Sequence, residues 1–295
     1  MSTPPSPSSK LTWVAVAPAL FVLLWSTGFI GSRYGIPYAE PFTLTAYRMA
    51  IVVALLTIIA FTFRAPWPRG WKNIAHIAVA GLCVHAIYLS GVLYAIKWQL
   101  PLGFIALIAG LQPLLTALIS RTLFHERLRL SQWLGILAGC IGVLLVVASK
   151  YVDGEVKLAA LIAATIAMLG ITIGTLYQKR FCQDMDLRTG GVIQFGATGV
   201  VIFALSLIFE TRTVVWAPQF IFSLFWLAIV LSLGAISLLY LLIRHGAATK
   251  VTSLFFLTPA VTAIMAYFLF NESLSWLAIV GLGVSACGVA LVSKK

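Results

Sequence analysis

The sequence predicts an all-α integral membrane protein with ten transmembrane helices in two inverted-topology five-helix repeats around a central cavity. Three observations carry this prediction. The 295 residues are 61% hydrophobic and only 9% charged, whereas soluble domains carry about a quarter charged residues. Apolar runs of roughly 20 residues, the length that crosses a hydrocarbon core as a helix, follow one another with short breaks. Part of the chain also returns at a spacing of 146 residues.

Ten apolar segments are long enough to span a bilayer as helices. In order they cover residues 13–33, 41–63, 73–96, 101–123, 131–149, 157–178, 188–209, 217–243, 247–270 and 275–293. They leave a Pro- and Ser-rich tail, residues 1–12, which we expect to be disordered and cytoplasmic. Little chain remains for a soluble catalytic domain, so we expect no enzyme activity and no cofactor.

The repeat divides the chain into residues 13–150 and 151–295. After a shift of 146 positions, residues 111–146 match residues 257–292 without a gap, with thirteen identities in 36 positions. A proline, a glutamate and two glycines are among the identities, so shared apolar composition does not explain them. Because each half holds five spans, an odd number, the two copies are expected to lie upside down with respect to each other, as in many secondary transporters.

The basic residues gather on one side of the predicted membrane. With the N-terminus inside, fourteen Lys and Arg residues fall on the inner side and five on the outer side. This positive-inside bias predicts a multi-pass protein of the inner (plasma) membrane with both termini in the cytoplasm. The net charge of +12 therefore indicates topology and not a nucleic acid partner.

The turn before the last span of each half shows the same bias. FHERLRL at residues 124–130 returns as FNESLSW at residues 270–276, which keeps Phe, Glu and Leu but loses both arginines. Only the first copy lies where positive charge is favoured. We predict that Glu126 and Glu272 each serve the positive N-terminal end of the span that follows, and that neither touches substrate.

Polar and aromatic side chains inside the spans are the candidate substrate-binding residues, because lipid offers them no hydrogen-bond partner. In chain order they are Trp25, Ser26, Arg48, His85, Tyr88, Gln112, Thr116, Tyr177, Gln194, Ser237, Tyr240 and Thr258. Gln112 and Thr116 lie four residues apart and so share one helix face, which is expected to point into the bundle. The same groups could instead join neighbouring helices or, for the aromatic ones, anchor the spans at the interface.

Arg48 is the only charged residue well inside a predicted span. Its guanidinium could hold a substrate carboxylate, or it could reach the outer surface, which lies about 10 Å away along the helix. All eight carboxylates lie in loops or at span ends. This favours a facilitator or an exchanger over a proton-driven or sodium-driven pump, unless coupling runs through a residue such as His85.

Two prolines and two sets of small residues recur at matching positions. Pro113 and Pro259 lie midway through the fourth and ninth spans, where each removes one helical hydrogen bond, and we predict hinge or gating positions there. Tolerated packing is the alternative. Small residues in the fifth and tenth spans predict close helix contacts. They are Gly135, Gly139, Gly142, Gly281, Ser285 and Gly288.

Three segments give the chain a family resemblance. They are LWSTGFIGSRYGI, EPFTLTAYRMA and LQPLLTALISRTLFHERLRLSQWLGILAGCIGVLLV, the last of which returns in altered form near the C-terminus. Together they resemble the drug/metabolite transporter superfamily, in particular its ten-span EamA-type exporters, over essentially the full chain. Within that family the sequence is most similar to the aromatic amino acid exporters of the YddG type. The resemblance implies that the fifth and tenth spans lie behind the other eight, which surround the cavity.

The sequence therefore predicts a secondary transporter that exports small metabolites, foremost aromatic or neutral amino acids, by alternating access between two repeats. The expected partners are a small-molecule substrate and the lipid bilayer, with no nucleic acid and no metal, and a monomer is one option for the assembly. Other amphiphilic metabolites or drugs are alternative substrates. A membrane scaffold or an integral membrane enzyme is the alternative class, and it predicts no transport in reconstituted vesicles.

Overall fold

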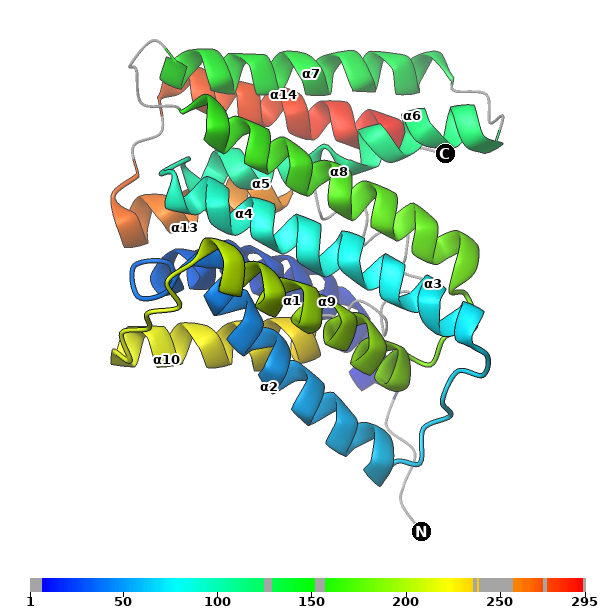
Figure 1. The fold of residues 1–295 in the computed structure, drawn as a ribbon. Coiled ribbons are helices and arrows are strands. Elements are labelled where there is room, and N and C mark those ends of the chain that lie inside the picture. Colours follow the sequence, from blue (N-terminus) through cyan, green and yellow to red (C-terminus); the bar gives the residue numbers. More distant parts are fainter. Residues whose placement is uncertain are drawn as a thin grey trace.

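The computed structural model describes residues 7–124, 129–151, 157–235, 238, 257–272 and 275–293. Within these ranges all regular secondary structure is helical, and the β-type pairing they contain is an isolated bridge between Ala39 and Val214. The helices form one bundle (Figure 1). The all-α prediction is confirmed for this part of the chain.

The helices of the two halves follow the predicted spans. The first half contains α1 (Pro7–Gly35), α2 (Pro41–Thr62), α3 (Trp71–Gly81), the π-helix η1 (Leu82–Ile87), α4 (Tyr88–Lys97), α5 (Leu102–Gly110), α6 (Gln112–Phe124) and α7 (Leu130–Tyr151). The second half contains α8 (Leu158–Phe181), α9 (Leu187–Phe209), α10 (Pro218–Phe225), the π-helix η2 (Trp226–Ala235), α13 (Thr258–Phe270) and α14 (Trp276–Ser293). A described helix thus lies in each of the ten predicted ranges.

By length and composition, five helical stretches could cross a membrane. They are Pro41–Thr62, Trp71–Lys97, Leu158–Phe181, Leu187–Phe209 and Pro218–Ala235. Shorter apolar helices cover Leu102–Thr116, Leu130–Val146, Thr258–Phe270 and Trp276–Gly288. Helix α1 begins at Pro7, inside the tail for which we expected disorder. Proline is compatible with a first helical turn, because its missing N–H would find no helical partner there.

The fourth predicted span is not one helix but two. The backbone N of Leu111 donates to the Ile108 carbonyl at 3.1 Å, and the N of Leu114 donates to the Leu111 carbonyl at 2.9 Å. Both bonds connect residues three apart, whereas the hydrogen bonds of an α-helix connect residues four apart. Pro113 follows the interruption directly and has no N–H to continue the ladder. The break between α5 and α6 therefore lies at the predicted hinge.

Two π-helices interrupt the third and eighth predicted spans. Segment η1 covers residues 82–87, and a shift of 146 places it at residues 228–233, inside η2. The π-helix is a rare geometry that occurs often at functional sites. The irregular parts of these two spans thus occupy matching positions in the two halves.

Helices α7 and α14 lie side by side along one edge of the bundle (Figure 1). Small residues allow this, since a Cβ atom added to Gly288 would lie 2.5 Å from the Gly135 carbonyl oxygen, and one added to Gly142 would collide with Ser285. The hydroxyl of Ser285 donates to the Gly139 carbonyl at 3.2 Å. Close packing at these small residues is confirmed, and the helix that each of the two packs against is the other one.

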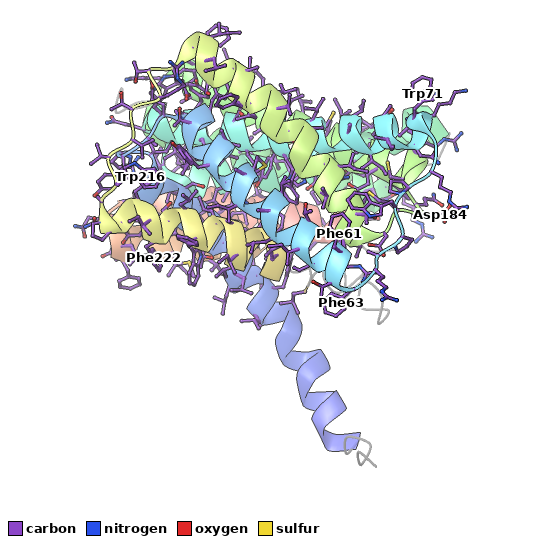
Figure 2. The ribbon with its side chains drawn as sticks, turned by 60° about the horizontal axis from the view of Figure 1, so that its bottom comes forward. Phe61, Phe63, Trp71, Asp184, Trp216 and Phe222 are labelled. Carbon is purple, nitrogen blue, oxygen red and sulfur yellow. The ribbon has the colours of Figure 1, made fainter. Side chains whose placement is uncertain are left out.

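One end of the bundle is held together by contacts between the two halves. The N of Val215 donates to the Tyr38 carbonyl at 2.9 Å, and the N of Thr211 donates to the Glu40 carboxylate at 2.7 Å. We call this the Glu210 end, after the buried carboxylate described below. Figure 2 shows Trp216 at this end and Trp71, Phe61 and Asp184 at the other.

Exposed aromatic side chains lie at both ends. Trp216 is 56% exposed at the Glu210 end and Trp71 is 74% exposed at the opposite end. Between the ends the core is apolar, with Ile96, Leu102 and Ile105 fully buried. Tryptophan at both ends of an apolar bundle is typical of membrane proteins, whose interfaces it favours.

Candidate functional site

Arg48 lies at the centre of the candidate site. It is 7% exposed and is the only buried Lys or Arg among the residues whose side chains the structure describes. From α2 its side chain crosses to the second half, where Nε and Nη2 donate to the Ser232 hydroxyl at 3.2 and 2.9 Å. The side chain is thus held inside the bundle. The alternative that it reaches the outer surface is wrong.

Arg48 has no acidic partner in the described chain. The ion pairs found there are Lys97 with Glu40 and Arg188 with Asp186, both near the ends of helices. A guanidinium carries five N–H donors, and the bonds to Ser232 use two of them, which leaves three without a described protein partner. A buried charge without a counterion is costly, so this site is suited to an anion.

His85 and Tyr88 lie beside Arg48, on η1 and at the start of α4. Both are buried and both lie close enough to the guanidinium for an electrostatic interaction. The imidazole stacks on Phe195, with ring centroids 4.1 Å apart and an interplanar angle of 23°. The structure therefore brings three predicted site residues together and adds an aromatic wall.

Gln194 completes this cluster from α9. It is buried and lies near His85. Its amide also donates to Gln178 Oε1 at 3.2 Å. Gln194 follows Arg48 by 146 residues, the repeat spacing. Arg48 thus binds the π-helix of the second half, while Gln194 approaches the π-helix of the first half.

A second group of polar side chains surrounds the fourth and ninth predicted spans. Gln112 Nε2 donates to Thr175 Oγ1 at 3.1 Å, and the buried Ser26 hydroxyl lies 3.5 Å from the Thr258 carbonyl oxygen. The hydroxyls of Thr258 and Thr262 are buried without a hydrogen-bond partner. The first contact connects the fourth predicted span to the sixth, and the second connects the first predicted span to the ninth. These residues thus lie where helices of the bundle meet.

The other predicted residues lie apart from Arg48 or outside the described residues. Tyr177 belongs to a cluster in which its hydroxyl lies 2.7 Å from His76 Nδ1, while the His76 ring stacks on Phe181. Trp25 is partly buried, with its ring 5.6 Å from that of Phe21. Two further predictions, Ser237 and Tyr240, lie outside the described residues.

Three more predicted positions sit in or beside the helix interruptions. Thr116 is partly buried on α6, three residues beyond Pro113. Pro259 is buried in the first turn of α13, next to Gly110 of α5, where an added Cβ would lie 3.1 Å from its ring. Pro259 of the second half therefore packs against the first half close in sequence to the break that precedes Pro113.

Glu210, which follows α9, holds the start of α2. Its carboxylate accepts hydrogen bonds from Phe42 N at 2.8 Å, Thr43 N at 2.7 Å, Thr43 Oγ1 at 2.8 Å and Tyr94 OH at 3.2 Å. The first amides of a helix have no partner within it, so a carboxylate from the other half caps α2. The sequence shows Glu210 only as a loop residue, because this contact joins distant segments.

Glu40 adds a second carboxylate contact at the same end. It accepts hydrogen bonds from Thr211 N and Oγ1 at 2.7 and 3.0 Å and pairs with Lys97 Nζ at 3.2 Å. Burial acts to raise the pKa of Glu40, but the hydrogen bonds from Thr211 and Lys97 outweigh it and hold that pKa below its usual range. The charged form of Glu40 thus favours the closed Glu210 end.

Glu272 differs from our prediction that it serves the helix after it. Its Oε2 accepts a hydrogen bond of 2.9 Å from the N of Leu102, the first residue of α5. The start of α14 is capped by Ser275, whose hydroxyl accepts from Ala278 N at 3.1 Å. Sequence proximity favoured the following helix, but folding places the end of α13 against α5.

Two small cavities lie near the interrupted helices. One of about 20 Å³ is lined by Gly110, Leu111 and Pro259, and one of about 10 Å³ is lined by Pro101, Ala263 and other side chains. Each has room for about one water molecule and is too small for an amino acid. A molecule of that size could enter this region only if helices moved apart.

Comparison with known proteins adds a family match. The sequence model of the EamA-like transporter family matches twice, at residues 12–148 and 158–294. The "Uncharacterized inner membrane transporter YedA" of Escherichia coli (strain K12) is 26% identical over 278 residues, which cover 93% of this chain and 89% of the relative. The "Uncharacterized transporter YvbV" of Bacillus subtilis (strain 168) is 23% identical over 292 residues, 96% of this chain and 92% of the relative.

A plant relative and a solved structure extend the likeness. A WAT1-related chloroplastic protein of Arabidopsis thaliana is 27% identical over 300 residues, 96% of this chain and 69% of the relative. A protein crystal structure matches with a TM-score of 0.66 at 19% identity and covers 97% of this chain and 98% of that one. At this identity the structural match shows the fold alone.

Proposed function

Because the chain belongs to the EamA-like transporter family, we propose that it is a secondary transporter that exports small metabolites bearing a carboxylate, with aromatic or neutral amino acids as its substrates. It crosses the inner membrane ten times, with both termini in the cytoplasm, and works by alternating access between two inverted repeats.

The inverted arrangement is supported by residues that contact their own counterparts. Ser285 follows Gly139 by 146 residues and donates a hydrogen bond to it. Phe195 follows Met49 by the same spacing, and both belong to one buried cluster. A residue can touch its repeat equivalent only near the axis that relates the copies. Such an axis between α7 and α14, and between α2 and α9, fits a two-fold relation in the membrane plane.

The substrate assignment rests on Arg48, a buried guanidinium that no described carboxylate neutralises. Its N–H fork matches the two oxygens of a carboxylate. The nearby Phe195 and Tyr88 offer aromatic surface for an apolar side chain. Such a site would suit the carboxylate and the apolar side chain of an aromatic or neutral amino acid.

Export is supported by the contacts at the Glu210 end. The excess of Lys and Arg on the other side supports an orientation with this end outside the cell. Contacts between the halves through Glu40, Glu210 and the Ala39–Val214 bridge hold it closed. A carrier that rests closed toward the outside is ready to load from the cytoplasm.

Counterflow in proteoliposomes tests the proposal. Vesicles preloaded with unlabelled L-phenylalanine should take up labelled L-phenylalanine when they contain the wild-type protein. Vesicles with Arg48→Gln should retain about a tenth of this rate or less, because one charge-assisted contact supplies about 1.5–3 kcal/mol. Asn73→Ala, at an exposed residue of α3 that binds only the Arg69 carbonyl, is the control and should transport normally.

Three outcomes separate the alternatives. Transport of L-phenylalanine but not of its amide supports the carboxylate assignment. Equal transport of the acid and the amide, with Arg48→Gln active, removes Arg48 from the site and favours other amphiphilic metabolites. A folded protein that moves none of a panel of labelled amino acids overturns the amino acid assignment.

A further inference from the structure

The bond between Arg48 and Ser232 joins the two halves in the middle of the bundle. Arg48 belongs to α2 of the first half and Ser232 to η2 of the second. Both side chains are buried, at 7% and 4% exposure. If η2 moves relative to α2, this bond has to break.

Ser232 is a weak partner for a guanidinium. It offers one neutral oxygen to two N–H groups, at 3.2 and 2.9 Å. A carboxylate offers two oxygens in the geometry of the fork together with a full opposite charge, whereas the bonds to Ser232 are charge-assisted on the donor side alone. A carboxylate that reaches this position therefore binds Arg48 in preference to Ser232.

Ser232 keeps a hydrogen-bond partner after a carboxylate displaces it from Arg48. Its hydroxyl already donates to the Leu227 carbonyl at 3.1 Å, within η2. Losing Arg48 would therefore leave no buried donor of Ser232 unpaired, whereas Arg48 without a partner would be a buried bare charge. Of the two residues, only Arg48 needs a new partner when the bond breaks, and a carboxylate is such a partner.

We propose that Ser232 and the substrate carboxylate compete for the Arg48 guanidinium, so that substrate binding releases η2 from α2. The inference rests on the proposed function, because it takes the substrate to be a metabolite with a carboxylate. It assigns Ser232 as a positioning residue that sets affinity by competition. Substrate binding and the freedom of the two halves to move are thereby coupled through one side chain.

Competition predicts that removing Ser232 strengthens binding. In purified protein, Ser232→Ala should lower the Kd for phenylacetate about tenfold, the loss of a competitor worth one or two hydrogen bonds. Phenethylamine, which has the same ring but no carboxylate, should bind neither protein. Ser223→Ala is the matched control, since Ser223 lies in the same predicted span but donates to the Gly31 carbonyl at 2.6 Å. Its Kd should equal that of the wild type.

Variants of Arg48 complete the test. Arg48→Gln should abolish phenylacetate binding, and Arg48→Lys, which keeps the charge but not the fork, should weaken it. In counterflow, Ser232→Ala should lower the KM for L-phenylalanine, whereas a merely structural serine would leave the KM unchanged or raise it. Thermal melting of each variant identifies any that fail to fold. If the Arg48 variants do not fold, the comparison of Ser232→Ala with Ser223→Ala still tests the competition.

The outcomes for the two proposals are distinguishable. If wild-type vesicles move no amino acid but phenylacetate binds tighter to Ser232→Ala than to Ser223→Ala, the competition stands and the amino acid assignment falls. If L-phenylalanine is transported but Ser232→Ala binds phenylacetate no better than Ser223→Ala, the competition is overturned and the transport proposal stands. If phenylacetate binds none of the proteins, the competition is likewise overturned.

Discussion

Replacing Glu210 by Gln should destabilise the fold through the start of α2. Each carboxylate oxygen of Glu210 accepts two hydrogen bonds, Oε1 from Phe42 N and Tyr94 OH and Oε2 from Thr43 N and Oγ1. A glutamine has only one acceptor oxygen. Its NH₂ group would face one backbone N–H, which loses its acceptor, and one hydroxyl, which can turn to accept but loses the charge of the carboxylate; two of the four charge-assisted bonds are thus lost.

The size of the effect follows from these two bonds. Charge-assisted hydrogen bonds contribute about 1.5–3 kcal/mol each, so losing two lowers the free energy of unfolding by about 3 kcal/mol or more. One kcal/mol corresponds to about 2–4 °C in Tm for a chain of 150–250 residues, so the melting temperature should fall by about 6–12 °C. A single helix cap, by comparison, contributes about 1 kcal/mol.

Thermal unfolding in detergent measures this change. Asp184→Asn is the matched control, because it makes the same replacement of a carboxylate by an amide at an exposed residue near the opposite end (Figure 2). The control should melt within about 2 °C of the wild type, as surface substitutions change stability by about 0.5 kcal/mol. If Glu210→Gln melts with the control, the carboxylate does not stabilise α2 and the reasoning from its four bonds is wrong.

Three further predictions concern packing, pH and the hinge. Gly142→Ala should lower the Tm by several degrees because its Cβ would collide with Ser285, whereas Gly283→Ala, with nothing within 4 Å, should not. The hydrogen bond from Arg188 holds the pKa of Asp186 below its usual range. The cap that Asp186 forms on α9 should therefore stabilise the protein above about pH 4, and this stabilisation should be lost as the pH falls through the lowered pKa. Asp186→Asn still caps the helix but cannot titrate, so its melting temperature should not show this loss. Pro113→Ala should restore a backbone donor, raise the Tm and slow counterflow; unchanged transport would remove Pro113 as a hinge.

Local patterns in the sequence predict much of this fold. Apolar runs mark where the helices lie, and the rule that charges in the membrane interior need partners identifies Arg48 as a candidate. The recurrence of small residues predicts close helix packing in α7 and α14, although it does not say which helices they pack against. Each of these features depends on neighbours along the helix or on the bilayer, so one sequence contains the information.

Contacts between the halves are harder to predict. Ser232 and Phe195 follow no motif, and their importance comes from the side chains that folding brings opposite them. Glu210 reads as a loop residue until α2 is placed beside it. The repeat spacing of 146 residues also pairs Arg48 with Gln194. This pairing could have indicated from the sequence that both residues lie near the same site.

The differences between the two repeats bear on the direction of transport. If the copies were identical, closing either end of the bundle would have the same free energy. Thr43 and Thr189 are 146 residues apart, but Thr43 binds the Glu210 carboxylate while Thr189 donates to the neutral Pro66 carbonyl at 2.7 Å. The residue that corresponds to Glu210 is Arg64, which cannot accept these bonds. At this pair of matching positions the Glu210 end therefore has a charged contact between the halves and the other end has a neutral one, an asymmetry that would favour an outward-closed resting state if the proposed orientation holds.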